Sequence, residues 1–167
     1  GLSINDVAVT EGNAGTVNAV FTVSLNIPAG PGGVTFDIAT ADNSATVANN
    51  DYVGNSLTGQ TIAAGNSSYQ FTVVVNGDTT VEPNETFFVN VTNVVGAKVS
   101  DGQGTGTINN DDVVITNIHD IQGPGASSPI VSTVVTTRGI VYAIRTNGYF
   151  LQNRGVDNDA DPATSEG

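Results

Sequence analysis

The stretch from residue 17 to residue 25, VNAVFTVSL, decides the fold class, because apolar and polar side chains alternate along it. An alternation with a period of two is typical of a β-strand that buries one face. The buried face of that strand would carry Val17, Ala19, Phe21, Val23 and Leu25. We therefore expect a strand here that packs against a second layer.

The same alternation recurs on both sides of this stretch, while no segment shows a 3.6-residue period. Turn-forming clusters rich in Gly, Pro, Asn and Asp separate the alternating segments. About seven short strands at this spacing predict an all-β fold, an antiparallel sandwich of two sheets. Besides residues 17–25, we expect strands near residues 2–9, 34–38, 69–75, 87–91 and 105–108.

The character of the chain changes after Asp112, so we predict one domain over residues 1–112 and another unit over residues 113–167. In the second unit we expect strands at 113–118 and 133–145. A hairpin should follow, because Asn147-Gly148 is a preferred pair for a tight type I′ turn. Three or four strands are too few for a closed barrel, and the second unit is therefore expected to be an incomplete β unit.

Composition excludes several classes of protein. The chain has no Cys, so it has no disulfide framework, and no apolar run approaches the roughly 18 residues of a membrane helix, so we expect no membrane insertion. Residues 1–112 carry eleven acids against Lys98 alone, a balance that argues against nucleic-acid binding there. The composition is typical of a secreted, extracellular or cell-surface bacterial protein, and the absence of an initiator Met suggests a segment of a longer chain.

Four acidic motifs follow one another along the first domain. They are VTEG at 9–12, TAD at 40–42 with NDY at 50–52, D78 with VEPNETF at 81–87, and TINNDD at 107–112. In this order they resemble a Calx-beta domain over residues 2–112, a family that occurs in sodium/calcium exchangers and bacterial surface proteins. The resemblance implies an immunoglobulin-like β-sandwich that binds calcium in loops at one end.

Carried over by position, the resemblance implies a set of calcium ligands. Its acidic ligand positions correspond to Glu11, Asp42, Asp78, Glu82, Glu85, Asp111 and Asp112. Asn110 stands where the exchanger domains have a further acid, and Asp51 lies beside the cluster. The Asn at 110 and the lack of an acidic run before Asp78 lead us to expect fewer ions or weaker binding than in those exchanger domains.

Elementary electrostatics supports the same expectation. Calcium takes six to eight oxygen ligands, which carboxylates from separate loops supply without rigid geometry. Two carboxylates about 4 Å apart repel by roughly 4 kcal/mol at an effective dielectric of 20, so converging acids would splay their loops unless a cation lay among them. The alternative is that these acids are solvated turn residues.

The second unit carries weaker signals. Residues 114–167, with DIQG at 120–123 and GYFLQ at 148–152, resemble the first half of an OB-like domain of secreted bacterial nucleases of the endonuclease/exonuclease/phosphatase superfamily. The basic and aromatic side chains of this unit could bind nucleic acid, or they could simply pack against one hairpin and keep it soluble. These side chains are Arg138, Arg145, Tyr149, Phe150 and Arg154.

Two further features of the second unit are candidate sites. Asp157, Asp159 and Asp161 have the spacing of a calcium loop, but Pro162 replaces the expected Gly and no Glu closes the loop. The single histidine, His119, has no nucleophile–base partner in the sequence pattern, so we expect no catalytic residue in this chain.

The sequence therefore predicts a non-catalytic calcium-binding module of a larger secreted or cell-surface protein. Calcium would make the loop end rigid and orient the neighbouring domain of the same polypeptide. Two alternatives stay open. The chain could be an accessory region of an extracellular nuclease, or a structural or adhesive subunit of a surface fibre that self-assembles by strand addition.

Overall fold

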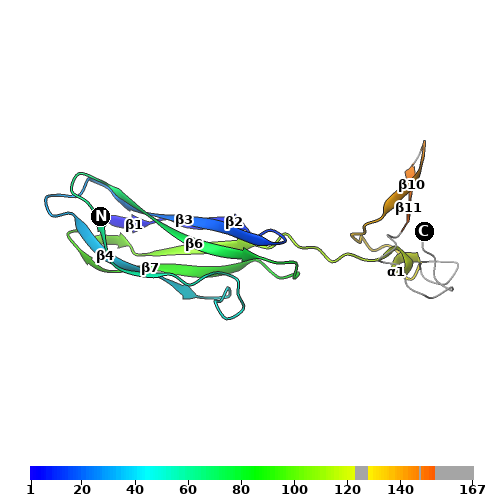
Figure 1. Cartoon of the computed structure of the whole chain (residues 1–167), viewed down its shortest axis with the longest axis horizontal. Helices are drawn as coiled ribbons and strands as arrows, with labels where there is room; N and C mark the ends of the chain where they lie inside the picture. The colour runs from blue at the N-terminus through cyan, green and yellow to red at the C-terminus, as the bar shows by residue number, and fades with distance from the viewer. Residues whose placement is uncertain (123–127, 147, 153–167) are drawn as a thin grey trace. The chain divides into compact units, whose positions relative to one another are not determined.

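The computed structural model describes residues 1–122, 128–146 and 148–152. The chain divides into two compact units, Gly1–Asp112 and Val113–Gly167. Figure 1 shows the first unit as two facing layers of strands, in which β3 and β6 lie against β4 and β7.

Two sheets make up the first unit. The four-stranded sheet has the order β6 (Ser68–Gly77), β3 (Gly15–Leu25), β1 (Leu2–Ile4) and β8 (Val99–Asp101). The five-stranded sheet has the order β2 (Val7–Thr10), β9 (Gln103–Asn109), β7 (Glu85–Val95), β4 (Val34–Asp42) and β5 (Ser56–Ile62). The predicted all-β sandwich is therefore confirmed.

The opening segment forms two strands in different sheets instead of the one strand expected at 2–9. The chain crosses from β1 to β2 at Asn5 and Asp6, whose side chains satisfy backbone groups of both sheets. Asn5 Oδ1 accepts the Thr22 N–H at 2.6 Å, and Asp6 Oδ1 accepts the Thr105 N–H at 2.7 Å. These bonds fix the crossing between the layers.

This crossing makes the sheets mixed. β1 runs parallel to β8 and β2 runs parallel to β9, so the expectation of wholly antiparallel pairing is wrong at these two pairs. The other strand pairs of the first unit are antiparallel, including the long β3–β6 pair from Gly15↔Gly77 to Ser24↔Ser68. Parallel strands end at the same edge of a sheet, which matters for the position of the acids.

The core lies between the sheets and is centred on aromatic rings. On the predicted inward face of β3, Ala19, Phe21 and Val23 are buried, while Val17 and Leu25 at its two ends are half-buried. The Phe87 ring stacks on Tyr52 at a centroid distance of 4.5 Å and meets Phe21 edge-on at 5.9 Å. Offset stacking and edge-to-face contacts are the favoured geometries of aromatic pairs. Phe87 thus joins both sheets to the loop that carries Tyr52.

The second unit begins with a short helix, α1 (Ile118–Gln122), followed by the hairpin of β10 (Ile140–Arg145) and β11 (Gly148–Gln152). The hairpin prediction is confirmed, although Asn147 of the predicted turn lies outside the described residues. Among the described residues, no helix is long and apolar enough to cross a bilayer. The expected OB-like architecture stays a prediction, and Arg154, Asp157, Asp159 and Asp161 also lie outside the described residues.

The strand expected at 113–118 does not form. Val113 and Val114 are 55% and 68% exposed, and the β pairing recorded for this stretch is a single bridge between Ile115 and Thr136. Without a neighbouring strand an extended apolar segment gains little from its side chains, and Ile118 is buried through the helix instead. The strand expected at 133–145 likewise shortens to β10.

The contact between Gly106 and Phe87 gives a test of the core. A Cβ on Gly106 would lie 2.3 Å from Cζ of Phe87, so Gly106→Ala should displace the ring from its stacked position on Tyr52. We expect the free energy of unfolding to fall by about 1–3 kcal/mol, the usual cost of overpacking. Urea denaturation followed by circular dichroism measures this change.

Gly30→Ala is the matched control, because a Cβ at Gly30 meets no heavy atom within 4 Å. We expect its free energy of unfolding to stay within about 0.5 kcal/mol of the wild-type value. If the Gly106 and Gly30 variants were equally stable, the position of the Phe87 ring would not require a glycine at residue 106.

Candidate metal centre

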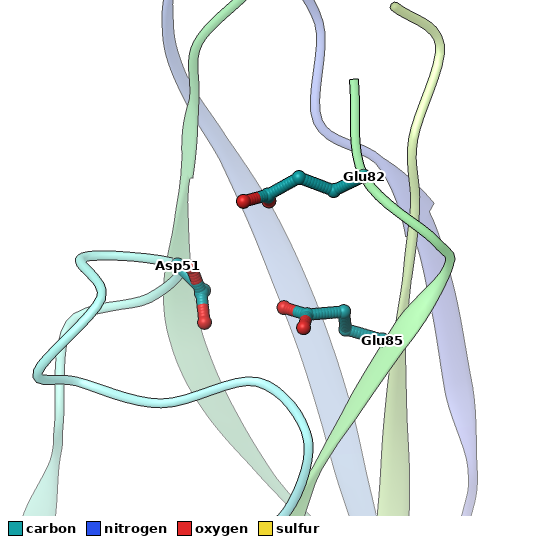
Figure 2. Close-up of side chains that lie close together, drawn as sticks. All are labelled: Asp51, Glu82 and Glu85. Atoms are coloured by element: carbon teal, nitrogen blue, oxygen red, sulfur yellow. The ribbon is translucent and has the colours of Figure 1, made fainter. Parts of the chain in front are cut away.

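Three carboxylates point toward one another at one end of the first unit, as Figure 2 shows. They belong to Asp51 in the β4–β5 connection, Glu82 in the β6–β7 connection, and Glu85 at the start of β7. One oxygen of each lies within 4.8 Å of the others. Carboxylate oxygens from three separate segments at this spacing suit a hard divalent cation.

A second group of acids surrounds Glu11, which follows β2. Glu11 is only 9% exposed, and its carboxylate feels the charges of Asp78, Asp112, Glu82 and Asp111. Burial, followed by these negative neighbours, raises the pKa of Glu11 to about 7. Because Glu82 acts on both Glu11 and Glu85, the two groups form one acidic end. We use the term acidic end for Glu11, Asp51, Asp78, Glu82, Glu85, Asp111 and Asp112.

Parallel pairing brings Glu11 to Asp111 and Asp112. β2 and β9 run in the same direction with Thr10 opposite Asn109, so the residues that follow both strands leave the sheet together. The Glu11 N–H donates to the Asn109 carbonyl at 3.3 Å, and the Gly12 N–H donates to Asp111 Oδ1 at 2.9 Å. Backbone bonds therefore hold these acids in place.

A glycine brings the β6–β7 connection against the same loop. A Cβ on Gly77 would lie 2.2 Å from the carbonyl oxygen of Gly12 and 2.6 Å from that of Glu11. Only a residue without a side chain allows this approach, and it places Asp78, the next residue, beside Glu11. Asp78 Oδ1 accepts the Thr80 N–H at 2.6 Å, which turns the chain after Gly77.

Asp112 has a buried carboxylate oxygen that lacks a hydrogen-bond partner. Its side chain is 9% exposed, and Oδ1 accepts a hydrogen bond from Asn13 Nδ2 at 2.5 Å. Oδ2 is buried without a hydrogen-bond partner. An ionised oxygen left this way is costly unless a cation or another donor satisfies it. A calcium ligand is satisfied by the ion itself, so this oxygen fits the donor set that calcium requires.

Asp42 and Asp51 have different surroundings although the sequence placed both near the site. Asp42 Oδ1 accepts hydrogen bonds from the Tyr52 hydroxyl at 2.5 Å and from the Val47 N–H at 3.1 Å. Asp42 thus anchors the β4–β5 connection. Asp51 Oδ2 accepts the Thr46 N–H at 2.6 Å, and its carboxylate belongs to the cluster of Figure 2.

Asp51 and Glu85 also interact directly. Burial is the first cause of a raised pKa at Glu85, and the charge of Asp51 and a hydrogen bond with it come next. The two carboxyl groups lie close enough to be bridged by one cation, which would offset the repulsion between them.

Asn110, predicted as a ligand, has both ends of its side chain occupied by the protein. Oδ1 accepts the Asp112 N–H at 3.0 Å, and Nδ2 donates to the Glu82 carbonyl at 2.7 Å. Sequence reasoning missed Asn13, Asn84 and Tyr52 as supports of the acids. The enrichment of Asn next to acids in the loops was the available signal, but the pairing of each amide is a property of the folded chain.

No basic side chain of residues 1–112 lies at the acidic end. The one Lys or Arg of residues 1–112 is Lys98, whose backbone carbonyl accepts the Leu2 N–H at 2.8 Å. Leu2 is opposite Leu25 at one end of β3, whereas Gly77, which precedes Asp78, is opposite Gly15 at the other end. An 11-residue strand separates the two ends by roughly 30 Å, so Lys98 does not neutralise the acids.

The raised pKa of Glu11 predicts how stability depends on pH without metal. The unfolded chain loses this proton near pH 4.5 and the folded chain near 7, so the folded state binds more protons between these values. The free energy of unfolding should therefore fall as the pH rises through this window, by about 3 kcal/mol from this group. Urea denaturation in chelator, repeated across the window, measures the slope.

Glu11→Gln is the control, because it keeps the shape of the side chain and removes the titrating group. Its slope should be clearly smaller than that of the wild type in the same window. A residual slope is expected, since the pKa of Glu85 is also raised. Identical slopes for the two proteins would contradict the buried position of Glu11.

Comparisons with known proteins agree with this fold. No protein-family model matches the chain, and no curated protein sequence matches it. The chain is similar to the crystal structure of CBD12 from CALX1.2, with a TM-score of 0.56 and 22% identity over 67% of this chain and 44% of that chain. The calcium binding domain CBD12 of CALX1.1 gives a TM-score of 0.56 and 22% identity over 70% and 50%.

A single-domain structure gives the same result. The apo-form Calx CBD1 domain matches with a TM-score of 0.53 and 20% identity, over 66% of this chain and 98% of that chain. The chain spans about half the length of the two CBD12 structures. At these identities the likeness concerns the fold, and the chain contains a β-sandwich with the fold of the Calx CBD domains.

Proposed function

We propose that residues 1–112 are a non-catalytic calcium-binding module of a larger secreted or cell-surface bacterial protein. The proposed ligands come from the acidic end, and Asp42 supports the loop that carries Asp51. Asn110 is left out of the ligand set because both ends of its amide are occupied. Calcium makes the loop end rigid and thereby fixes the residues that lead into the second unit.

The observation that carries this proposal is the buried, unpartnered Oδ2 of Asp112 among acids that have no neighbouring basic side chain in residues 1–112. Solvated turn acids, the alternative reading, would be exposed and free to separate. Glu11 and Asp112 are instead buried and fixed by backbone and amide hydrogen bonds. An arrangement that keeps repelling charges together is what a divalent cation stabilises.

The fold comparisons support the choice of calcium. The matched CALX1.1 structure is that of a calcium binding domain, and the fold is shared at 22% identity. Oxygen ligands alone favour calcium or magnesium over zinc or copper, and flexible loops suit the larger ion. Extracellular calcium modules bind at about 10⁻⁴ to 10⁻³ M, which is the range proposed here.

The role at the junction follows from the position of Asp112 in the chain. It is the last residue of the first unit and is followed directly by Val113, the first residue of the second. A cation bound to Asp112 would restrict the segment that connects the units. We propose that calcium orients the neighbouring part of the polypeptide in this way.

Calcium binding predicts that Glu82→Gln lowers the melting temperature relative to the wild type in calcium but not in chelator. In excess calcium the wild type should melt about 10 °C higher than in chelator, since about a hundredfold excess over Kd adds about 2.7 kcal/mol. Glu82→Gln should lose most of this gain because Glu82 lies in both groups of acids. In chelator the same variant should melt at or above the wild-type temperature, because one repelling charge is gone.

Asp101→Asn is the matched control. It removes the same charge from β8, and its Oδ1 can still accept the Gln103 N–H. It should keep the full calcium-dependent rise in melting temperature. Melting curves of the wild type that coincide in calcium and in chelator would refute the proposal, and calorimetric titration of calcium gives the affinity directly.

A further inference from the structure

Asn110 joins the two segments that carry Glu82 and Asp112. Its Oδ1 accepts the Asp112 N–H at 3.0 Å, while its Nδ2 donates to the Glu82 carbonyl at 2.7 Å. The first bond turns the chain so that the Asp112 side chain enters the acidic end. The second holds the β6–β7 connection, which carries Glu82, against the end of β9.

These two bonds need an amide. One end of the side chain must accept and the other must donate, which Asn does and an ionised Asp does not. An Asp at this position could still accept the Asp112 N–H, but its second oxygen would face the Glu82 carbonyl oxygen. Two acceptors at hydrogen-bond distance repel, so the carboxylate would push the β6–β7 connection away.

Two other asparagines strengthen the same junction. The Asn110 N–H donates to Asn84 Oδ1 at 3.1 Å, and Asn84 Nδ2 donates to Asn109 Oδ1 at 3.2 Å. Neutral side chains thus connect the β6–β7 loop to the end of β9 without adding charge to the acids. They hold the segment that carries Glu82 in place.

From this geometry we infer that Asn110 is a positioning residue rather than a ligand: its amide clamps the Glu82 segment to Asp112, so that both carboxylates face one cation. The inference rests on the proposed function. Supports of this kind commonly change metal affinity by 10–100-fold when they are lost, although they never touch the ion.

Replacing Asn110 by Asp distinguishes a ligand role from a positioning role, because the two roles predict opposite changes in calcium affinity. A ligand role predicts tighter binding of calcium, since a charged oxygen replaces a neutral one. A positioning role predicts weaker binding despite the added charge, because the bond to the Glu82 carbonyl is lost. We expect the calcium Kd of Asn110→Asp, measured by calorimetric titration, to rise about tenfold relative to the control.

Asn109→Asp is that control. It adds the same charge one residue earlier and keeps the oxygen that accepts from Asn84 Nδ2. Its affinity for calcium should equal or exceed that of the wild type. If Asn110→Asp binds calcium as tightly as Asn109→Asp, or more tightly, the positioning role is wrong while the proposed function stands. If the wild type binds no calcium, the proposed function itself fails.

A second measurement uses the wild type alone, and so does not depend on how the variants fold. Hydrogen exchange at the Asp112 amide should be slow in chelator and stay slow in calcium, because Asn110 Oδ1 remains its acceptor. A ligand role would draw that oxygen toward the ion. Loss of protection at this amide on adding calcium would overturn the inference.

Discussion

Repulsion among carboxylates at one end of the sandwich is the interaction on which the rest of the structure depends. Asp51, Glu82 and Glu85 bring oxygens within 4.8 Å of one another, and Glu11 lies near Glu82 and three further charges, those of Asp78, Asp111 and Asp112. At an effective dielectric of 20, a pair about 4 Å apart repels by about 4 kcal/mol, which is comparable to much of the stability of a small domain. The sheets and loops around the site must withstand this force before any cation binds.

The chain withstands it with neutral groups. Asn13 and Asn110 hold Asp112, the backbone of Gly12 holds Asp111, and Tyr52, which is stacked on Phe87, holds Asp42. Burial and the hydrogen bond to Asp42 also raise the pKa of Tyr52, so the phenol stays a donor. Aromatic packing in the core and hydrogen bonds of amide groups in the loops therefore act together to keep the acids close. The acids themselves remain available for a cation.

The alternation of VNAVFTVSL was enough to predict the buried face of β3 and, with its repeats, the sandwich. It could not predict β5, because SLTGQTI has one buried residue and no apolar alternation. Nor could it predict the crossing at Asn5 and Asp6, which depends on side-chain bonds to Thr22 and Thr105 in different sheets. The acids could be named from their motifs, whereas the occupied amide of Asn110 could be seen only once its partners were in place.

The crossing between the sheets, which the sequence pattern does not predict, also builds the site. Had the opening segment continued as one strand beside β3, Glu11 would not have followed a strand of the other sheet. Because the chain crosses over, β2 runs parallel to β9 and the two strands end at the same edge, with Thr10 opposite Asn109. An antiparallel pair would have sent Glu11 and Asp112 to opposite ends of the sandwich. The pairing of one four-residue strand thus decides whether acids 100 and 101 positions apart in sequence meet at all.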